Sequence, residues 1–189
     1  MIFATNNKGK LSEIKEILKE FEIYSLNEKN IDIDVIEDED TFYGNALKKA
    51  KEIYNIAKEP VIADDSGLCI TDLNDFPGVL THRFLGESAT DEERNYELIR
   101  RVNDAQDRSA KVVCNLVYYD GINILVGEGI LHGKITTEPR GENGFGFDPI
   151  FELENGKTLA EISSEEKNKL SARCLAASDL VKKIKRISI

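Results

Sequence analysis

The sequence has few cysteines, and none of them is placed for a disulfide framework or a zinc site. Cys69, Cys114 and Cys174 are an odd number, widely spaced, and each lies in apolar surroundings. This pattern is typical of small core residues in a reducing compartment. The chain also lacks the roughly 18 consecutive apolar residues of a membrane span, and its start, "MIFATNNKGK", has no apolar segment suited to a secretory signal. These absences predict a cytoplasmic protein.

The chain also lacks an excess of positive charge, because its net charge is -10 at pH 7. Non-specific binding to nucleic acid depends on a basic surface, so we expect no nucleic-acid partner. A small anionic ligand is still compatible with this charge, since a few local lysines and a divalent cation can hold it. With 189 residues, of which 41% are hydrophobic and 32% charged, the chain is expected to form one globular domain over residues 1–189.

The apolar periodicity alternates between that of strands and that of helices. A strand at "MIFA" leads through a polar loop into a helix, and a second helix is expected from Asp40 or Thr41 to just before Pro60. The capping box "TDEE" predicts a third helix to about Val102, and "SSEE" has the same spacing ahead of the last helix. Two strands in "AKVVCNLVYYDGINILVGEGIL" are expected to join in a tight turn at Asp120-Gly121. The sequence therefore predicts an α/β fold.

The polar loop after the first strand, "TNNKGK", is a candidate anion site. A loop that delivers the chain to a helix start offers backbone N–H groups and the positive end of the helix dipole, and Lys8 and Lys10 add charge. It is not a Walker A loop, because Leu11 stands where Ser or Thr would be required. On this pattern alone an ordinary capped surface helix is the simpler interpretation.

The stretch "VIADDSGLCI" places two adjacent carboxylates, Asp64 and Asp65, inside an apolar run. Two such acids repel one another and lose hydration on burial, and binding of a divalent cation removes both penalties. A turn capped by Asp64 or Ser66, with Gly67 turning the chain, would explain one acid but not two. A further ligand could come from "DIDVIEDED", which has six acids in nine residues.

Two later segments are candidates for contact with a flat ligand and an anion. "RGENGFGFDPIF" has glycines that allow close approach, aromatic rings that can stack on a base, and Asp148 as an acceptor for ring N–H groups. By itself this segment favours a Gly-rich hairpin with core phenylalanines. "EEKNKLSAR" places Lys167 and Arg173 around a helix start.

Taken in order, six segments resemble the inosine triphosphate pyrophosphatase family. They are "FATNNKGKLSEI", "TFYGNALKKA", "VIADDSGL", "FPGV", "GENGFGFDPIF" and "AEISSEEKNKLSAR", and they span nearly the whole chain. The resemblance implies an α/β fold with an elongated, mixed and twisted β-sheet, flanking helices and two lobes around a nucleotide-binding cleft, usually as a homodimer. It also implies Mg²⁺-dependent hydrolysis of ITP, dITP or XTP to a nucleoside monophosphate and pyrophosphate, which removes deaminated purines from the nucleotide pool.

The resemblance also implies roles for individual residues of this chain. Asp65 would be the general base and a metal-linked acid, Glu37 the partner ligand, and Asp64 a support for the metal shell. Lys10 would act in catalysis, and the remaining substrate contacts would be Thr5, Asn6, Asn7, Lys8, Gly9, Ser66, Phe145, Gly146, Phe147, Asp148, Lys167, Ala172 and Arg173. Among these, Phe145 would stack on the purine and Asp148 would read its edge.

The chain departs from the family pattern at two positions. The family usually has Ser-His-Arg where this chain has Ser171-Ala172-Arg173, and His82 stands where the family tends to have Ala. Loss of an imidazole from the base pocket puts purine selectivity in question, because strong rejection of an analogue depends on a polar group that it leaves unpaired. His82 could replace it, although a flanking position is the simpler interpretation. Two alternatives stay open, a related nucleotide pyrophosphatase with another base preference and a nucleotide-binding protein with little turnover.

Overall fold

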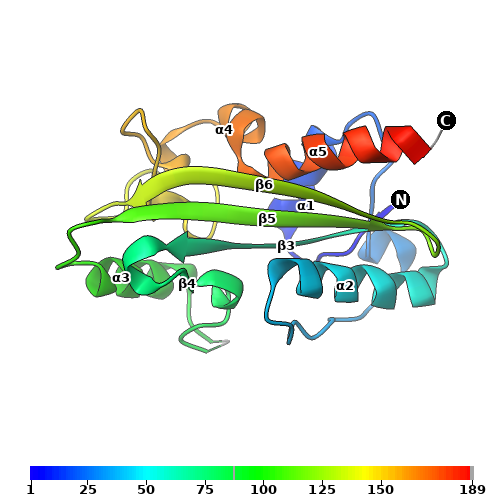
Figure 1. The fold of residues 1–189 in the computed structure, drawn as a ribbon, viewed down its shortest axis with the longest axis horizontal. Helices are drawn as coiled ribbons and strands as arrows, with labels where there is room; N and C mark the ends of the chain where they lie inside the picture. Colours follow the sequence, from blue (N-terminus) through cyan, green and yellow to red (C-terminus); the bar gives the residue numbers. More distant parts are fainter. Residues whose placement is uncertain (87, 188–189) are drawn as a thin grey trace. The chain divides into compact units, whose positions relative to one another are not determined.

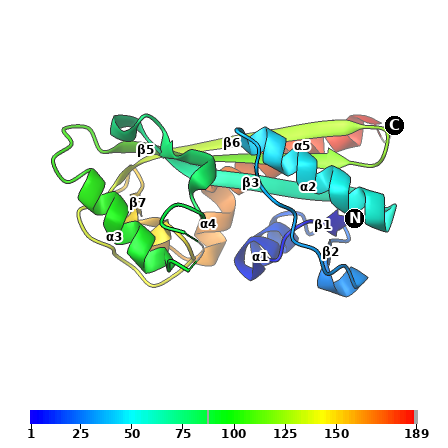
Figure 2. The same cartoon turned by 90° about the horizontal axis from the view of Figure 1, so that it is seen from below.

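The computed structural model describes residues 1–86 and 88–187. The helices and strands follow one another as β1 (Ile2–Phe3), α1 (Lys8–Ile17), β2 (Tyr24–Ser25), α2 (Phe42–Ala57), β3 (Val61–Ile70), β4 (Phe76–Pro77), α3 (Asp91–Arg101), β5 (Ser109–Tyr119), β6 (Ile124–Ile135), β7 (Phe151–Glu152), α4 (Ser164–Leu170) and α5 (Ala172–Ile187). Figures 1 and 2 together label these elements. No helix of the described residues is long and apolar enough to cross a membrane.

The strands form one mixed sheet of seven strands in the order β2-β1-β3-β5-β6-β7, with β4 paired to β3. β1 runs parallel to both β2 and β3, whereas β4 runs antiparallel to β3 and β7 antiparallel to β6. By its contacts the chain forms two compact units. Unit 1 comprises residues 1–65, 114–129 and the chain from 171 onward, and unit 2 comprises residues 66–113 and 130–170. The expected single domain with two lobes around a cleft stays a prediction.

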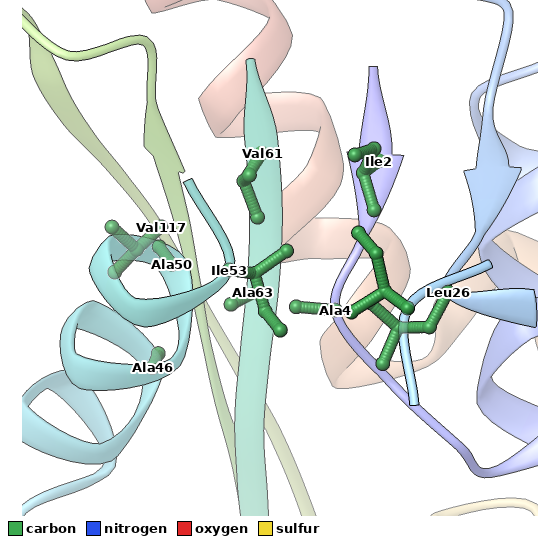
Figure 3. Packing of buried hydrophobic residues seen from close by; sticks show 10 residues of the cluster. Ile2, Ala4, Leu26, Ala46, Ala50, Ile53, Val61, Ala63 and Val117 are labelled. Carbon is green, nitrogen blue, oxygen red and sulfur yellow. The ribbon is translucent and has the colours of Figure 1, made fainter. Parts of the chain in front are cut away.

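In unit 1, helices lie on both faces of the strands. Figures 1 and 2 show α2 on one face of β3 and β5 and α5 on the opposite face. On the α2 face, Ala46, Ala50 and Ile53 are buried with Val61 and other strand residues, as Figure 3 shows. On the α5 face, a Cβ atom at Gly127 or Gly129 would clash with helix carbonyl oxygens, so these glycines let the helix approach β6 closely. The sheet of unit 1 is therefore enclosed on both sides.

The helix starts follow the sequence signals. Thr41 caps α2 by accepting a hydrogen bond from the Gly44 N–H, and Thr90 and Glu93 form the expected capping box at α3. The last helical region differs from the prediction, since it is divided into α4 and α5 at Ser171. The hairpin loop is also longer than expected, because residues 120–123 separate β5 from β6 and only Gly121 of the expected pair has a positive φ.

The alternative interpretation of a turn at Ser66-Gly67 is wrong. Strand β3 continues without interruption from Val61 to Ile70, and every one of its residues is buried. The acids at its centre are therefore strand residues rather than turn residues, and this determines which way each of them points.

Candidate active site

The predicted phosphate loop lies at the start of α1 in unit 1. Helix α1 already begins at Lys8, so Lys8, Gly9 and Lys10 form its first turn rather than part of a loop. Asn7 is the cap residue, and its side-chain oxygen accepts a hydrogen bond from the Lys10 N–H at 3.0 Å. Thr5 accepts from the Asn7 N–H, while the Asn6 amide donates to the carbonyl oxygen of Ile33. The exposed Asn6, Asn7 and Lys8 lie at the positive end of the helix dipole, an arrangement suited to an anion.

Asp64 and Asp65 point to opposite faces of β3, because successive side chains of a strand alternate. The contacts agree with this rule. Asp64 meets Lys10 of α1 and Arg173 of α5, whereas Asp65 meets Asn45 of α2. The two carboxylates therefore have different direct partners, although the charges of Lys10 and Lys49 act on both. A role for Asp64 in the same metal shell as Asp65 stays a prediction.

Asp64 is the centre of a buried ion cluster. Its Oδ2 atom lies 3.2 Å from the Lys10 Nζ and 3.0 Å from a guanidinium nitrogen of Arg173, which also pairs with Glu13. Burial raises the pKa of Asp64, but the charges of Lys10 and Arg173 outweigh it and hold the pKa well below its usual range. Arg173, expected to contact base and phosphate, is bound to these two acids here.

Asp65 has the opposite electrostatic character. Its side chain is buried, and its Oδ2 atom accepts a hydrogen bond from the Asn45 amide at 2.9 Å. Burial raises the pKa of Asp65 to about 6, with the negative charge of Glu37 adding to the rise and Lys49 and Lys10 opposing it. A carboxyl group with such a pKa can accept and release a proton near neutral pH.

Lys49 links Glu37 to the centre of β3. Its Nζ atom donates to Glu37 at 2.6 Å and also to the backbone oxygen of Asp64. Burial lowers the pKa of Lys49, but the charges of Asp64, Glu37 and Asp65 outweigh it and raise the pKa above its usual value. Of the acids near Glu37, Asp38 pairs with Lys48 at 2.5 Å. Glu37 is therefore tied to the buried site through Lys49.

Three residues of these clusters were not identified from the sequence as site residues, namely Glu13, Asn45 and Lys49. Each lies in a segment that carries the family resemblance, but their types gave no separate signal. The usable signal was helical spacing: Asn45 and Lys49 are four residues apart and therefore share a face of α2 with the buried Ala46 and Ala50. Polar residues on an otherwise apolar helix face indicate a buried polar partner.

The fit of the expected magnesium ion can be tested on these side chains. Within residues 1–86 and 88–187, no three His, Cys, Asp or Glu side chains form a metal-binding group. Mg²⁺ does not require one, because it is commonly bound by one or two carboxylates while waters and substrate phosphates complete its shell. Asp65 and Glu37 offer such a pair, since both interact electrostatically with Lys49 and the charge of Glu37 acts on Asp65.

In unit 2, Asp148 organises the predicted base-binding residues. Its Oδ2 atom accepts hydrogen bonds from the Lys167 Nζ at 2.6 Å and from the Phe145 N–H at 2.8 Å. The Lys167 ammonium lies 4.3 Å from the centre of the Phe145 ring, within the range of a cation–π contact. The structure thus brings Phe145, Asp148 and Lys167 together within this unit.

A pocket of about 370 Å³ lies beside these residues in unit 2, between α3 and the glycine-rich segment. Phe145, Gly144 and Gly146 line it together with Asn95 and Tyr96 of α3. The Asn95 amide donates to the Gly146 carbonyl oxygen at 2.9 Å and holds the segment against the helix. Gly141, Gly144 and Gly146 all have positive φ, which explains why the segment needs glycine.

The remaining predicted residues lie as follows. Phe147 and the half-buried His82 line a second, smaller pocket of unit 2, next to Gly146. Ser66 is buried in β3 directly after Asp65, and Ala172 is buried at the first position of α5 in unit 1. His82 therefore belongs to the surroundings of the glycine-rich segment.

Comparisons with known proteins cover nearly the whole chain. A model of the Ham1 family matches residues 1–183. The dITP/XTP pyrophosphatase of Clostridium perfringens (strain 13 / Type A) is 43% identical over 198 residues, which cover 98% of this chain and 97% of that protein. The dITP/XTP pyrophosphatase of Aquifex aeolicus (strain VF5) is 40% identical over 195 residues, with 98% and 96% covered.

Solved structures agree with the sequence comparisons. The Staphylococcus aureus Ham1 protein superposes with a TM-score of 0.88 at 34% identity, covering 100% of this chain and 98% of that one. A HAM1 protein from Coxiella burnetii gives a TM-score of 0.88 at 36% identity, with 98% of each chain covered. The mixed α/β fold expected from the sequence is confirmed.

Proposed function

Because the chain belongs to the Ham1 family, we propose that it hydrolyses non-standard purine nucleoside triphosphates, namely ITP, dITP and XTP. The products would be the nucleoside monophosphate and pyrophosphate, and the reaction would remove these nucleotides from the pool. The observation that carries the proposal is the pairing of a buried Asp65, whose pKa is about 6, with the Glu37–Lys49 ion pair beside it.

Asp65 acts as the general base in this proposal. A base with a pKa near neutral orients the attacking water and accepts its proton without remaining protonated at the working pH. The N-terminus of α1 binds phosphate oxygens through its backbone N–H groups and through Asn7, Lys8 and Lys10. Lys49 adds a buried positive charge. Mg²⁺ held by Asp65 and Glu37 would supply neutralisation of the charge that grows on the phosphate oxygens. Hydrolysis then depends mainly on positioning and electrostatic stabilisation.

Unit 2 supplies the residues for the base. Phe145 presents an aromatic face, and the glycines beside it allow a flat ring to approach the backbone. The Asp148–Lys167 pair offers both an acceptor and a donor for the edge of a purine. We also propose that the protein is a cytoplasmic homodimer and has no nucleic-acid partner. The homodimer rests on the family resemblance, and the lack of a nucleic-acid partner rests on the net charge of -10.

A substrate panel tests the proposal directly. We expect Mg²⁺-dependent release of pyrophosphate from ITP or XTP at least about tenfold faster than from ATP or GTP, which corresponds to about 1.4 kcal/mol in transition-state binding. The measurement is kcat/KM for each nucleotide by pyrophosphate detection, with and without EDTA. Equal rates for all four nucleotides would reject the selectivity.

The same panel separates the alternatives. A related pyrophosphatase with another base preference is favoured by one observation, the buried Ala172 at the start of α5 where the family usually has histidine. It would hydrolyse some nucleotide efficiently but not prefer ITP or XTP. A nucleotide-binding protein with little turnover would bind nucleotides yet release no pyrophosphate above background.

The role of the Asp148–Lys167 pair in selectivity has its own test. Substitution Lys167→Met is expected to narrow the preference for XTP over GTP about tenfold, because the donor to the base edge is lost while the phosphate-binding residues of unit 1 are untouched. The ratio of kcat/KM values for the two nucleotides measures this effect. The control is Lys169→Met, because Lys169 forms an exposed ion pair with Glu165 on the same helix. This substitution should leave the ratio unchanged. An unaltered ratio in Lys167→Met would remove the pair from base recognition.

A further inference from the structure

Asn45 is a fully buried polar residue that has no role as a reactant in the proposed chemistry. It lies near the start of α2 with an exposed fraction of 0%. Its Nδ2 atom donates to the Asp65 Oδ2 at 2.9 Å, and its Oδ1 atom accepts from the backbone N–H of Glu39 at 3.0 Å. Asn45 therefore joins the carboxylate on β3 to the acidic loop that precedes α2.

The orientation of this amide is fixed by chemistry. A backbone N–H can only donate, so the amide oxygen of Asn45 must face Glu39. The nitrogen must then face Asp65, where a carboxylate oxygen accepts. Asparagine carries its donor and its acceptor on two separate atoms, so one short side chain can reach two partners at once. Both partners here are buried or backbone groups, and leaving either one unpaired costs free energy.

Asn45 also acts together with Lys49, one turn further along the same face of α2. Lys49 holds Glu37 at 2.6 Å, and Glu37 lies two residues before the Glu39 that Asn45 holds. Helix α2 thus fixes the acidic loop at two neighbouring points and fixes Asp65 at a third. The two acids proposed for the cation are held in position by one helix face.

Close packing at Gly44 gives a second sign that the loop is held tightly. A Cβ atom at Gly44 would lie 2.9 Å from the Cβ of Glu39 and 3.0 Å from the Thr41 hydroxyl oxygen. The absence of a side chain at residue 44 lets the loop lie directly against the helix, within reach of the Asn45 amide.

We infer that Asn45 is a positioning residue, which holds the Asp65 carboxylate and the Glu37-bearing loop in the relative arrangement that one divalent cation requires. This inference rests on the proposed function. Groups that orient metal-binding carboxylates commonly affect metal affinity or activity about 10- to 100-fold when they are removed. Asn45 acts in this inference through Asp65 and the acidic loop rather than on the substrate.

The experiment compares Asn45→Ala and Asn45→Ser with the unmodified protein. We expect kcat for XTP to fall about 10- to 100-fold, the half-saturating Mg²⁺ concentration to rise about tenfold, and KM for XTP to change less than about threefold. Binding of Mn²⁺ alone, measured by electron paramagnetic resonance, should weaken to a similar extent. A residue that only stabilised the fold would lower the melting temperature without altering Mn²⁺ affinity.

Asn115→Ala is the matched control. Asn115 is also a buried asparagine of unit 1 whose amide donates to a carboxylate, that of Glu128 at 3.2 Å, but it belongs to neither acid cluster. It should leave Mn²⁺ affinity and kcat unchanged. If Asn45→Ala does not fold, the smaller change Asn45→Ser decides by the same measurements, because a serine cannot reach both partners at once.

The failure of this inference differs from the failure of the proposed function. A folded Asn45 variant with unchanged Mn²⁺ affinity and unchanged kcat, beside an unmodified protein that hydrolyses XTP, overturns the positioning role alone. An unmodified protein that binds Mn²⁺ but releases no pyrophosphate overturns the proposed function, while the comparison of Mn²⁺ affinities still tests Asn45.

Discussion

The substitution Asp65→Asn is expected to lower kcat for XTP at least about 100-fold, since general-base catalysis contributes about 10²- to 10⁴-fold. Asparagine has the same shape and can still accept the Asn45 hydrogen bond through its amide oxygen, so the fold should be kept. It cannot accept the proton of the attacking water, and it is a weaker ligand for a divalent cation. The loss should therefore appear in kcat for every nucleotide alike.

The same substitution is expected to stabilise the protein. Because the pKa of Asp65 is raised to about 6 in the folded state, the neutral carboxyl favours folding below about pH 4, and this contribution is lost as the pH rises through about 6. The ionised form then costs the folded state about 3 kcal/mol relative to the unfolded chain at pH 8. Asparagine carries no such cost, so the free energy of unfolding at pH 8 should rise by up to about this amount in the absence of divalent metal.

Urea unfolding of both proteins at pH 4 and pH 8 in EDTA measures the change in stability, and pyrophosphate release measures the change in kcat. Asp179→Asn is the control, because this half-buried carboxylate of α5 accepts hydrogen bonds from Lys183 and from the Glu128 N–H of β6 and belongs to neither acid cluster. It should leave kcat unchanged and alter the free energy of unfolding by less than about 1 kcal/mol. A fully active Asp65→Asn protein would remove Asp65 from its catalytic role, and a stability difference of equal size at both pH values would contradict the electrostatic origin.

Much of the fold could be predicted from local signals. The capping threonines of α2 and α3 and the apolar positions of these helices act over a few residues, so their positions follow from sequence spacing alone. The break at Ser171 could not be predicted in this way, because the apolar stripe continues across it. Likewise, Ser66 and Gly67 are typical of turns, yet tertiary packing holds them in a buried strand.

The residue types of the candidate site could be predicted from the sequence, but the direct partners of each acid could not. Two adjacent acids in an apolar run indicate an unusual site, but mutual repulsion alone does not say which groups satisfy each carboxylate. Once β3 is a continuous strand, the two-residue period separates them, and the partners that satisfy each acid come from different helices. Those partners lie more than 15 residues away in sequence, and no local pattern indicates which lysine or arginine reaches which acid.

The second large effect is expected for Arg173→Met, which should lower the free energy of unfolding at pH 7 by about 3–5 kcal/mol. The guanidinium is buried between Asp64 and Glu13, and Asp64 has an exposed fraction of 0%. Removal of the arginine leaves Asp64 with its Lys10 contact at 3.2 Å and takes away the guanidinium that pairs with Glu13. Burial of a carboxylate that has lost its counter-ion is far more costly than loss of an exposed pair.

The pH dependence shows whether the cost of Arg173→Met arises in this way. In the unmodified protein the pKa of Asp64 is held below its ordinary value, so the cluster contributes stability that is present above about pH 4 and lost as the pH falls further. Without Arg173 the pKa of Asp64 should rise, and the deficit of the variant should shrink as acid neutralises the carboxyl. Urea unfolding from pH 2 to pH 8 measures both curves. The control is Lys185→Met on the same helix, because Lys185 forms an exposed ion pair with Glu20, and it should show no measurable change. The double variant Asp64→Asn with Arg173→Met should recover part of the loss, because the uncompensated charge is removed with its partner. A deficit no larger than that of Lys185→Met would mean that the buried cluster contributes nothing to folding, and Arg173 would then be held in place for substrate binding alone.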